Sequence, residues 1–237
     1  MKILLTLFVL FFTTIGFSET TEIYLDSTYL KKNLVINADH YSNSRENKTV
    51  AISIHGTRGF KSMEVISILS DNLLDLDIDT IAPNISYGIN DRENEFLSCD
   101  IEHLHNRYAN IDEIIRWFTF AIEKDYKDII LIGHSRGGQD IIQAYKKILK
   151  VYPEESKKIS SIVLLAPLGD NIDEINISIQ KSHSTTISEL IDKDENKFVK
   201  INFLNCNDAT VKISSFLSYY NLSYHEQLVP MLTDINI

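Results

Sequence analysis

Positive charge is scarce in this sequence. The 237 residues include 23 Lys and Arg against 33 Asp and Glu, for a formal net charge of −10 at pH 7. Because the acidic residues are spread along the whole chain, the sequence lacks the basic patch with which proteins bind nucleic acid or an anionic membrane surface. Internal repeats, low-complexity tracts and a linker rich in Pro and Ser are also absent. These absences favour one globular domain that binds neither kind of polyanion.

Long hydrophobic runs are missing except at the N-terminus. There, one positive charge precedes the apolar residues 3–12, and a polar exit containing Gly16 and Ser18 follows. The run is short for a membrane span, and its flanks are typical of a secretory signal peptide, with an uncleaved anchor as the alternative. We therefore expect residues 1–18 to be a signal peptide. Residues 19–237 would then form a single exported domain, periplasmic or secreted, without a membrane span.

Cysteine is equally sparse, since Cys99 and Cys206 are the only two. In an exported protein we expect the two to pair in a disulfide rather than remain free thiols. His103 and His105 follow Cys99 closely, and thiolates and imidazoles are zinc ligands. This set has no obvious fourth ligand and no standard spacing, so we favour histidines that line or brace a pocket over a metal site.

The most informative motif present is a predicted strand, followed by a serine between two nearby glycines and then by a predicted helix. Residues 129–132 are four consecutive apolar residues, as expected of a parallel strand buried on both faces. Gly133-His134-Ser135-Arg136-Gly137 follows, and apolar residues then recur at 141, 145, 148 and 149, the spacing of one helix face. A serine on so tight a strand-to-helix turn is a nucleophile elbow, which exposes the serine hydroxyl above the sheet edge.

A second turn, His55-Gly56-Thr57-Arg58-Gly59, ends the apolar strand predicted at residues 49–54. Together the two turns, in this order, resemble those of the α/β-hydrolase superfamily. The resemblance implies the α/β-hydrolase fold, an α/β fold of three layers with a mostly parallel sheet and helices on both faces. It further implies an esterase-like, lipase-like or peptidase-like reaction that requires no cofactor.

The same resemblance assigns roles around Ser135. The backbone N–H groups of Thr57 and Arg136 become the oxyanion hole, which stabilises the charge that develops on the attacked carbonyl oxygen. Arg58 and Arg136 stand next to these donors. We expect their guanidinium groups to favour a substrate carrying a carboxylate or phosphate, unless they pair with local Asp and Glu. We interpret His55 as a histidine that braces its turn.

The remaining catalytic groups are single residues placed by chain order. The resemblance puts the triad acid after a late strand, where Asp208 follows the strand predicted at residues 198–206. Asp170, after the preceding strand, is the second choice for the acid. His225 is the only histidine after Asp208, so the order Ser, Asp, His closes only with it. Asp208 also suits a helix cap, a role compatible with catalysis.

A polar connection of residues 84–109 is long enough to overhang the site, and it is the only candidate for a lid. We expect a helix to begin at Asn110, because Asn110 and Glu113 have the form of a capping box. His103 and His105 lie in this connection and are candidate substrate contacts.

These observations predict a serine hydrolase that cleaves an ester or amide bond of a small-molecule substrate through an acyl-enzyme intermediate. Two alternatives from other classes remain. One is a catalytically inactive hydrolase fold that serves as a binding protein. The other is a metal-dependent hydrolase that uses Cys99, His103 and His105. The sequence does not choose among acyl groups, leaving groups or oligomeric states.

Overall fold

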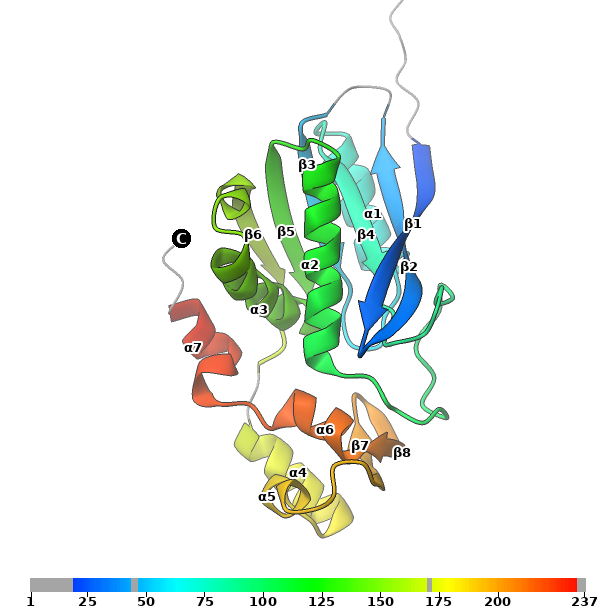
Figure 1. The fold of residues 1–237 in the computed structure, drawn as a ribbon, viewed down its shortest axis with the longest axis vertical. Helices are drawn as coiled ribbons and strands as arrows, with labels where there is room; N and C mark the ends of the chain where they lie inside the picture. The colour runs from blue at the N-terminus through cyan, green and yellow to red at the C-terminus, as the bar shows by residue number, and fades with distance from the viewer. Residues whose placement is uncertain (1–18, 44–46, 170–171, 234–237) are drawn as a thin grey trace, which may run out of the picture.

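A computed structural model of the chain shows a sheet with helices on both faces and a smaller lobe at one end (Figure 1). The structure describes residues 19–43, 47–169 and 172–233. The expected signal peptide, residues 1–18, and Asp170 lie outside these described residues. Among the helices so described, none is long and apolar enough to cross a membrane.

Within the described residues the main sheet has six strands, in the order β1-β2-β4-β3-β5-β6. β3 to β6 run parallel to one another, whereas β1 pairs with β2, and β2 with β4, in antiparallel orientation. This is the mostly parallel sheet that the sequence predicts, with two antiparallel strands leading. The bounds are β1 (Glu19–Tyr29), β2 (Lys32–Ser42), β3 (Thr49–Ile54), β4 (Asp79–Asn84), β5 (Asp128–His134) and β6 (Ile159–Leu165).

Helices cover both faces of this sheet. α2 (Arg107–Glu123) and α3 (Arg136–Val151) lie side by side on one face, and α1 (Glu64–Leu74) lies on the other (Figure 1). β3 is buried from its second residue to its end, and apolar residues of α2, among them Ile114 and Phe118, join the same core. On the other face, Ile66 of α1 packs with Tyr41 and Ala82 in a second, smaller cluster, so the sheet buries apolar side chains on both faces.

Residues 172–233 form what we call the C-terminal lobe. The elements of its first part pack around a hydrophobic core of their own, which includes Phe203 and Phe216. In Figure 1, α4 to α6 and the β7–β8 hairpin lie below the sheet, at the end where β5 and β6 finish, whereas α7 lies beside α3. The bounds are α4 (Ile172–His183), α5 (Ile187–Ile191), β7 (Phe198–Phe203), β8 (Cys206–Lys212), α6 (Ile213–Tyr220), η2 (Tyr224–Glu226) and α7 (Leu228–Thr233), with the short η1 (Glu155–Lys158) preceding β6.

One strand differs from its prediction. The segment expected as a further strand of the main sheet, residues 198–206, forms β7 and pairs only with β8, as a separate two-stranded antiparallel sheet. Leu204 and Asn205 both have positive φ, 49° and 65°, the conformation of a two-residue hairpin turn. This turn reverses the chain at once, and the alternating burial of β7 suits a sheet with only one buried face.

The long connection also ends earlier than predicted. α2 begins directly after Asn106, whose side chain accepts the N–H of Tyr108 and so caps the helix. Asn110 and Glu113, which the sequence suggests as the capping pair, lie buried inside the helix and bond partners across the interior. The connection therefore spans residues 85–106.

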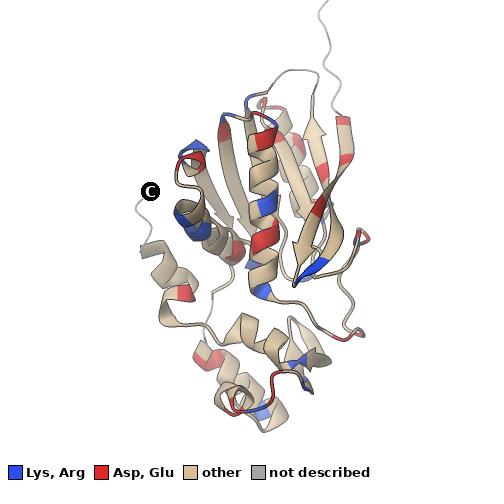
Figure 2. Ribbon diagram, viewed as in Figure 1, with Lys and Arg blue, Asp and Glu red and all other residues tan. Residues whose placement is uncertain are grey.

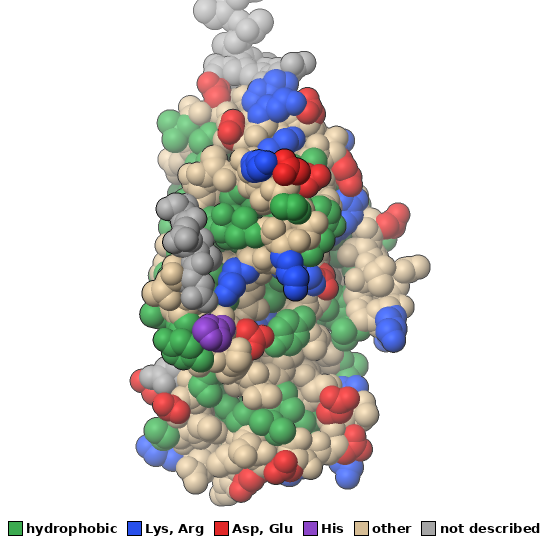
Figure 3. Space-filling model, turned by 60° about the vertical axis from the view of Figure 1, so that its left-hand side comes forward, with side chains coloured by type: hydrophobic (Ala, Val, Ile, Leu, Met, Phe, Trp, Pro, Cys, Tyr) green, Lys and Arg blue, Asp and Glu red, His purple; other side chains and the backbone are tan. Residues whose placement is uncertain are grey.

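Charged side chains are distributed over both parts of the molecule (Figure 2). On the face shown in Figure 3, Lys and Arg side chains are interspersed with Asp and Glu and with apolar groups. No patch of a single sign spans that face, in keeping with the mixed charge pattern of the sequence.

Candidate active site

Ser135 stands on the sharp turn between β5 and α3. Its backbone has φ 53° and ψ −120°, a strained conformation for a residue that carries a side chain. The turn is held on both sides, because Ser135 N donates to Leu165 O and Ser135 O accepts the N–H groups of Gly138 and Leu168. Ser135 itself is half-buried. The local geometry is that of a nucleophile elbow.

The two glycine-rich turns lie against each other. A Cβ at Gly56 would be 3.1 Å from the Cβ of Ser135, and a Cβ at Gly137 would be 2.5 Å from the carbonyl oxygen of His55. The second distance is shorter than a Cβ tolerates, and the obstacle is backbone, which has little freedom to move. Glycine is therefore required where the end of β3 approaches the start of α3. This close approach places the turn after β3 beside Ser135.

The expected oxyanion donors lie in these same two turns. Within the described parts of the chain, the backbone N–H groups of Thr57 and Arg136 donate to no protein acceptor. The neighbouring N–H of Arg58, in contrast, donates to the hydroxyl of Tyr87. Arg136 N is the first N–H of α3, where a helix leaves such groups without an internal partner. Two unengaged donors beside the elbow suit an oxyanion hole.

His55 braces the turn after β3. Its Nδ1 donates to Gly56 O at 2.9 Å, and its Nε2 accepts the N–H of Ile85 at 3.2 Å. Burial lowers the pKa of this imidazole to about 3, so the ring is neutral at physiological pH. Both ring nitrogens are engaged, which leaves His55 unsuited to act as a base.

The two arginines beside the oxyanion donors hold buried donors without partners. The Arg136 guanidinium lies over the rings of Tyr219 and Tyr220, 5.6 and 5.9 Å from their centroids, and its Nε and Nη1 have no hydrogen-bond partner. Arg58 donates through Nη1 to a backbone carbonyl and to Cys99 Sγ, while its Nε has no partner. No Asp or Glu of the described residues pairs with either guanidinium, so the expected alternative of local ion pairs is not found.

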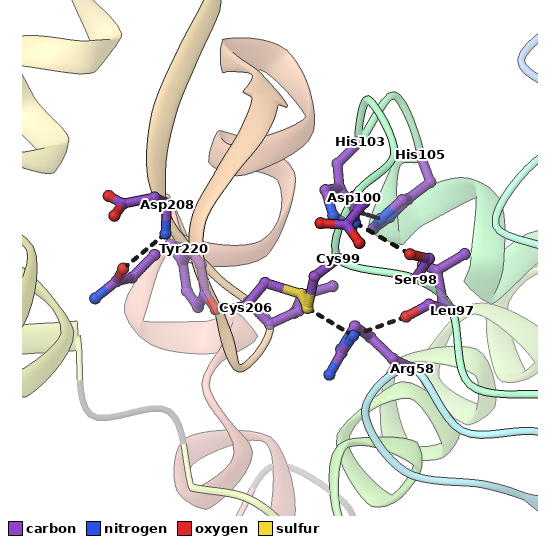
Figure 4. The surroundings of a disulfide bond; sticks show 12 residues. Arg58, Leu97, Ser98, Cys99, Asp100, His103, His105, Cys206, Asp208 and Tyr220 are labelled. Carbon is purple, nitrogen blue, oxygen red and sulfur yellow. Dashed lines mark hydrogen bonds between the residues drawn. A yellow bond between two sulfur atoms is a disulfide. The ribbon is translucent and has the colours of Figure 1, made fainter.

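The long connection is fastened over this region. Cys99 in the connection and Cys206 at the start of β8 form a disulfide, as expected from the sequence (Figure 4). Arg58 contacts the connection on the other side, since its carbonyl accepts the N–H of Leu97. The connection is thus tied both to the turn that carries Thr57 and to the C-terminal lobe.

The metal-dependent alternative fails on this disulfide. The sulfur of Cys99 is bonded to another sulfur, so it cannot serve as a thiolate ligand. His103 Nδ1 lies 3.1 Å from His105 Nε2, and His105 Nδ1 lies 2.9 Å from the Tyr219 hydroxyl. Burial lowers the pKa of both imidazoles. The two histidines are part of a buried hydrogen-bond network, and the described residues hold no cluster of three metal-ligating side chains.

The structure does not bring Asp208 to the elbow. Asp208 lies within β8 with its side chain 74% exposed, and its Oδ1 is 3.7 Å from Nδ1 of His183. In Figure 4 its carboxylate points away from the disulfide and from His103 and His105. The position follows from the β7–β8 hairpin, which carries Asp208 on its outer side instead of at the end of a strand of the main sheet.

His225 is also distant from Ser135. It lies exposed in η2, beside α3, where its carbonyl accepts from Lys146 and the next carbonyl accepts from Gln143. Gln143 comes eight residues after Ser135 (143 − 135), which corresponds to about 12 Å along the helix. The catalytic roles of Ser135, Asp208 and His225 stay predictions, and the described arrangement does not assemble them.

Sequence reasoning missed the aromatic residues that surround the site. Tyr87 holds the turn after β3 through its hydroxyl, and Tyr219 and Tyr220 cover the Arg136 guanidinium. All three come from segments distant in the sequence from either glycine-rich turn. The adjacent tyrosines at the end of α6 were a visible signal, but only the fold shows what they face.

No protein-family model matches the chain, and no curated protein matches it in sequence. Solved structures do match its fold. Est1E from Butyrivibrio proteoclasticus aligns with a TM-score of 0.57 at 16% identity, over 85% of this chain and 70% of that one. The same protein with ferulic acid bound aligns with a TM-score of 0.54 at 16% identity, over 86% and 68%.

The α/β hydrolase GrgF from Penicillium sp. sh18 aligns at 16% identity with a TM-score of 0.48, over 76% of this chain. The chain spans 58% of GrgF, less than two-thirds of its length. At such identities a match establishes the fold and not the reaction. The chain adopts the α/β-hydrolase fold, as its two glycine-rich turns predict.

Proposed function

We propose that this protein is a serine hydrolase that cleaves a carboxylic ester of a small molecule through an acyl-enzyme on Ser135. One observation supports the proposal above the others. Ser135 stands on a strained turn that lies against Gly56 of the other glycine-rich turn. Each of the two turns offers one unengaged backbone N–H group, that of Thr57 and that of Arg136. Nucleophile and oxyanion donors are the two parts of an acyl-transfer site that need fixed backbone geometry.

The mechanism follows from these positions. A base removes the proton of the Ser135 hydroxyl as its Oγ attacks the ester carbonyl, and the N–H groups of Thr57 and Arg136 stabilise the tetrahedral oxyanion. The base then protonates the leaving alcohol, which departs and leaves the acyl group on Oγ. Water attacks the acyl-enzyme by the same route and releases the acid. Each step is proton transfer and carbonyl addition, so no redox group takes part.

We assign the base to His225, and this assignment requires a movement. The segment of residues 221–233 would have to shift along α3 by about two helical turns to bring the imidazole to Ser135. That movement would have to break the bonds of the η2 carbonyls with Gln143 and Lys146, and the packing of Leu228 and Met231 on Ile142. It would also break the bond that the Tyr108 hydroxyl of α2 donates to Glu226. Asp208 would orient the imidazole only after exchanging its present partner, His183.

The acyl or alcohol part of the substrate is proposed to carry a negative charge. Arg58 and Arg136 offer buried N–H groups without partners beside the oxyanion donors, and buried donors ordinarily have an acceptor. Wild-type protein should hydrolyse an anionic ester several-fold faster than a neutral ester of the same alcohol, and Arg58→Ala should reduce this preference. Equal rates for both esters in both proteins would rule out an anionic substrate.

A fluorophosphonate probe tests the serine mechanism directly. It phosphonylates only an activated serine, and intact-mass spectrometry counts one adduct per chain. We expect labelling of wild-type protein and none of Ser135→Ala. Ser161→Ala is the matched control, since Ser161 is an exposed serine on β6 whose hydroxyl bonds only a neighbouring backbone carbonyl. Labelling that persists in Ser135→Ala would contradict the proposal.

A second candidate, a catalytically inactive hydrolase fold that binds a ligand, is favoured by one observation. In the described arrangement, neither Asp208 nor His225 is close to Ser135, and the two are not in contact with each other. If wild-type protein is folded by circular dichroism, takes up no probe and hydrolyses no ester of either charge, this second function replaces the first.

A further inference from the structure

A cavity of about 780 Å³ lies at the opposite end of the sheet from Ser135. It is walled by β1, the end of β2, the start of β4 and the end of α2. Two of the lining residues mark this end of the sheet: Asp79 is the first residue of β4, and the carbonyl of Lys48 accepts the N–H of Asp128 at the start of β5. Ser135, in contrast, follows the last residue of β5. β5 therefore separates the two places by roughly 20 Å. The volume lies within the range of small-molecule sites.

A chain of buried polar groups lines one side of this cavity. The Tyr126 hydroxyl donates to Asp79 Oδ2 at 2.6 Å, and Asn47 Nδ2 donates to Asp79 Oδ1 at 2.6 Å. His40 Nε2 lies 3.1 Å from the same Tyr126 hydroxyl. Asp79 and Tyr126 are both buried, so this carboxylate is satisfied from within the protein and not by solvent.

The hydrogen-bond order fixes the tautomer of His40. Burial, and the bond to Asp79, raise the pKa of Tyr126, so its proton stays on the hydroxyl and is given to Asp79. The hydroxyl oxygen must then accept, which puts a proton on His40 Nε2 and a lone pair on Nδ1. Burial lowers the pKa of His40, so the ring is neutral at pH 7. The side chain of His40 is 23% exposed, toward the cavity that it lines.

Both signs of charge line this cavity: Lys48 and Lys124 are cationic, and Glu22 and Asp79 are acidic. Lys124 lies 5.4 Å from the centroid of the Phe120 ring and forms no ion pair with the described residues. Glu22, on the opposite wall, is already paired with the buried Lys61. Ile23 and the Phe120 ring supply the apolar part of the lining, while the hydroxyl of the neighbouring Tyr24 donates to Glu22 on the other face of β1.

We propose that this cavity binds a small aromatic hydroxy acid. The aromatic ring packs on Phe120 and Ile23, the carboxylate faces the ammonium of Lys124, and the hydroxyl donates to Nδ1 of His40. This site is independent of the chemistry at Ser135, because none of its residues lies in the elbow or the turn beside it.

Binding of 4-hydroxybenzoate, measured by isothermal titration calorimetry on Ser135→Ala protein, tests the proposal. Benzoate lacks the hydroxyl and 4-hydroxybenzyl alcohol lacks the carboxylate. Each should bind about two- to fivefold more weakly than 4-hydroxybenzoate, the usual effect of one partly exposed hydrogen bond or ion pair. Equal binding of the three compounds, or no saturable binding at millimolar concentrations, would overturn it.

Variants locate the ligand. Lys124→Gln should weaken 4-hydroxybenzoate about threefold or more and leave 4-hydroxybenzyl alcohol unchanged. Lys127→Gln is the matched control, since Lys127 pairs with Asp125 outside the cavity, and it should have no effect. His40→Phe should abolish the difference between 4-hydroxybenzoate and benzoate, with thermal melting to confirm folding. Affinity that falls in Arg58→Ala and not in Lys124→Gln would place the ligand at the elbow and refute the site.

Discussion

The elbow and the C-terminal lobe differ in how their residues are held. At the elbow, backbone contacts define each position: the carbonyl of Ser135 accepts two N–H groups, and a Cβ at Gly137 would lie only 2.5 Å from the carbonyl oxygen of His55. In the lobe, Asp208 and His225 are exposed side chains on a hairpin and a single turn of 3-10 helix. Function proposed for the first rests on local geometry, and function proposed for the second rests on chain order.

The comparison shows which features of a three-dimensional site a sequence can predict. A glycine pattern specifies a turn because only glycine fits the backbone approach, so the geometry is contained in the pattern itself. A lone Asp or His acquires its role from distant elements that must pack in one particular way. The predictions that follow probe each side of this difference.

The largest effect is expected at His225. If His225 is the base, His225→Gln lowers the rate of fluorophosphonate labelling and of ester hydrolysis by about a thousandfold or more, as loss of a catalytic histidine does in other serine hydrolases. Single-turnover labelling followed by mass spectrometry measures the rate. The alternative histidine of the lobe, His183, is the matched control, and His183→Gln should change the rate less than threefold. The opposite pattern would make His183, which Asp208 already contacts, the base.

Much of the sheet follows from sequence alone. The strand predicted at residues 49–54 is β3 to the residue, because a run of apolar residues bounded by polar ones is buried on both faces. The elbow follows for the reason given above. The start of α2 does not follow from the sequence. Asn110 and Glu113 have the pattern of a capping box, but their side chains form hydrogen bonds with buried partners instead. Only tertiary contacts decide between those two uses of the same residue types.

The lobe illustrates the same limit. The segment of residues 198–206 reads equally well as a buried strand of the main sheet and as half of a hairpin. The positive φ of Leu204 and Asn205 selects the hairpin, and leucine gives no sign of such a turn. The position of Asp208 depends wholly on that choice, so chain order alone does not place the acid.

Gly137→Ala should disrupt the backbone geometry of the elbow. The added methyl would lie 2.5 Å from the backbone oxygen of His55, so β3 and α3 must move apart. We expect a loss of about 3 kcal/mol or more in the free energy of unfolding, measured by urea denaturation, together with slower labelling of Ser135. Gly169→Ala is the control, because nothing lies within 4 Å of a Cβ there. Equal stability of the two variants would show that the close approach is not rigid.

Removal of the disulfide tests how the lobe is held to the sheet. Cys99 and Cys206 are 107 positions apart, so their bond restricts the unfolded chain strongly. The double variant Cys99→Ser/Cys206→Ser should lose about 2–4 kcal/mol of the free energy of unfolding. Hydrogen exchange should increase in α6 and the β7–β8 hairpin before β3 or β5 is affected. An increase spread evenly over the whole chain would mean that lobe and sheet unfold as one unit.

The smallest predicted effect concerns Glu113, a buried carboxyl on the sheet side that accepts the N–H and hydroxyl of Ser86. Burial raises its pKa from 4.5 to about 7, so the folded state holds a proton that the unfolded chain releases. Its contribution to stability is complete below pH 4.5 and is lost as the pH rises through about 7. His55, whose pKa is lowered to about 3, acts in the opposite sense below pH 6.5, because there only the unfolded chain binds the proton.

The difference between Glu113→Gln and wild-type protein isolates the Glu113 term, since His55 contributes equally to both. Glutamine imitates the protonated acid, so the variant should match wild type near pH 4.5 and exceed it by about 2–3 kcal/mol above pH 7.5, as urea denaturation across this range would measure. Glu123→Gln, an exposed carboxyl on the same helix, should show no such trend. A difference that stays constant with pH would mean that Glu113 is ionised in the folded protein, and that the buried start of the long connection accommodates a charge.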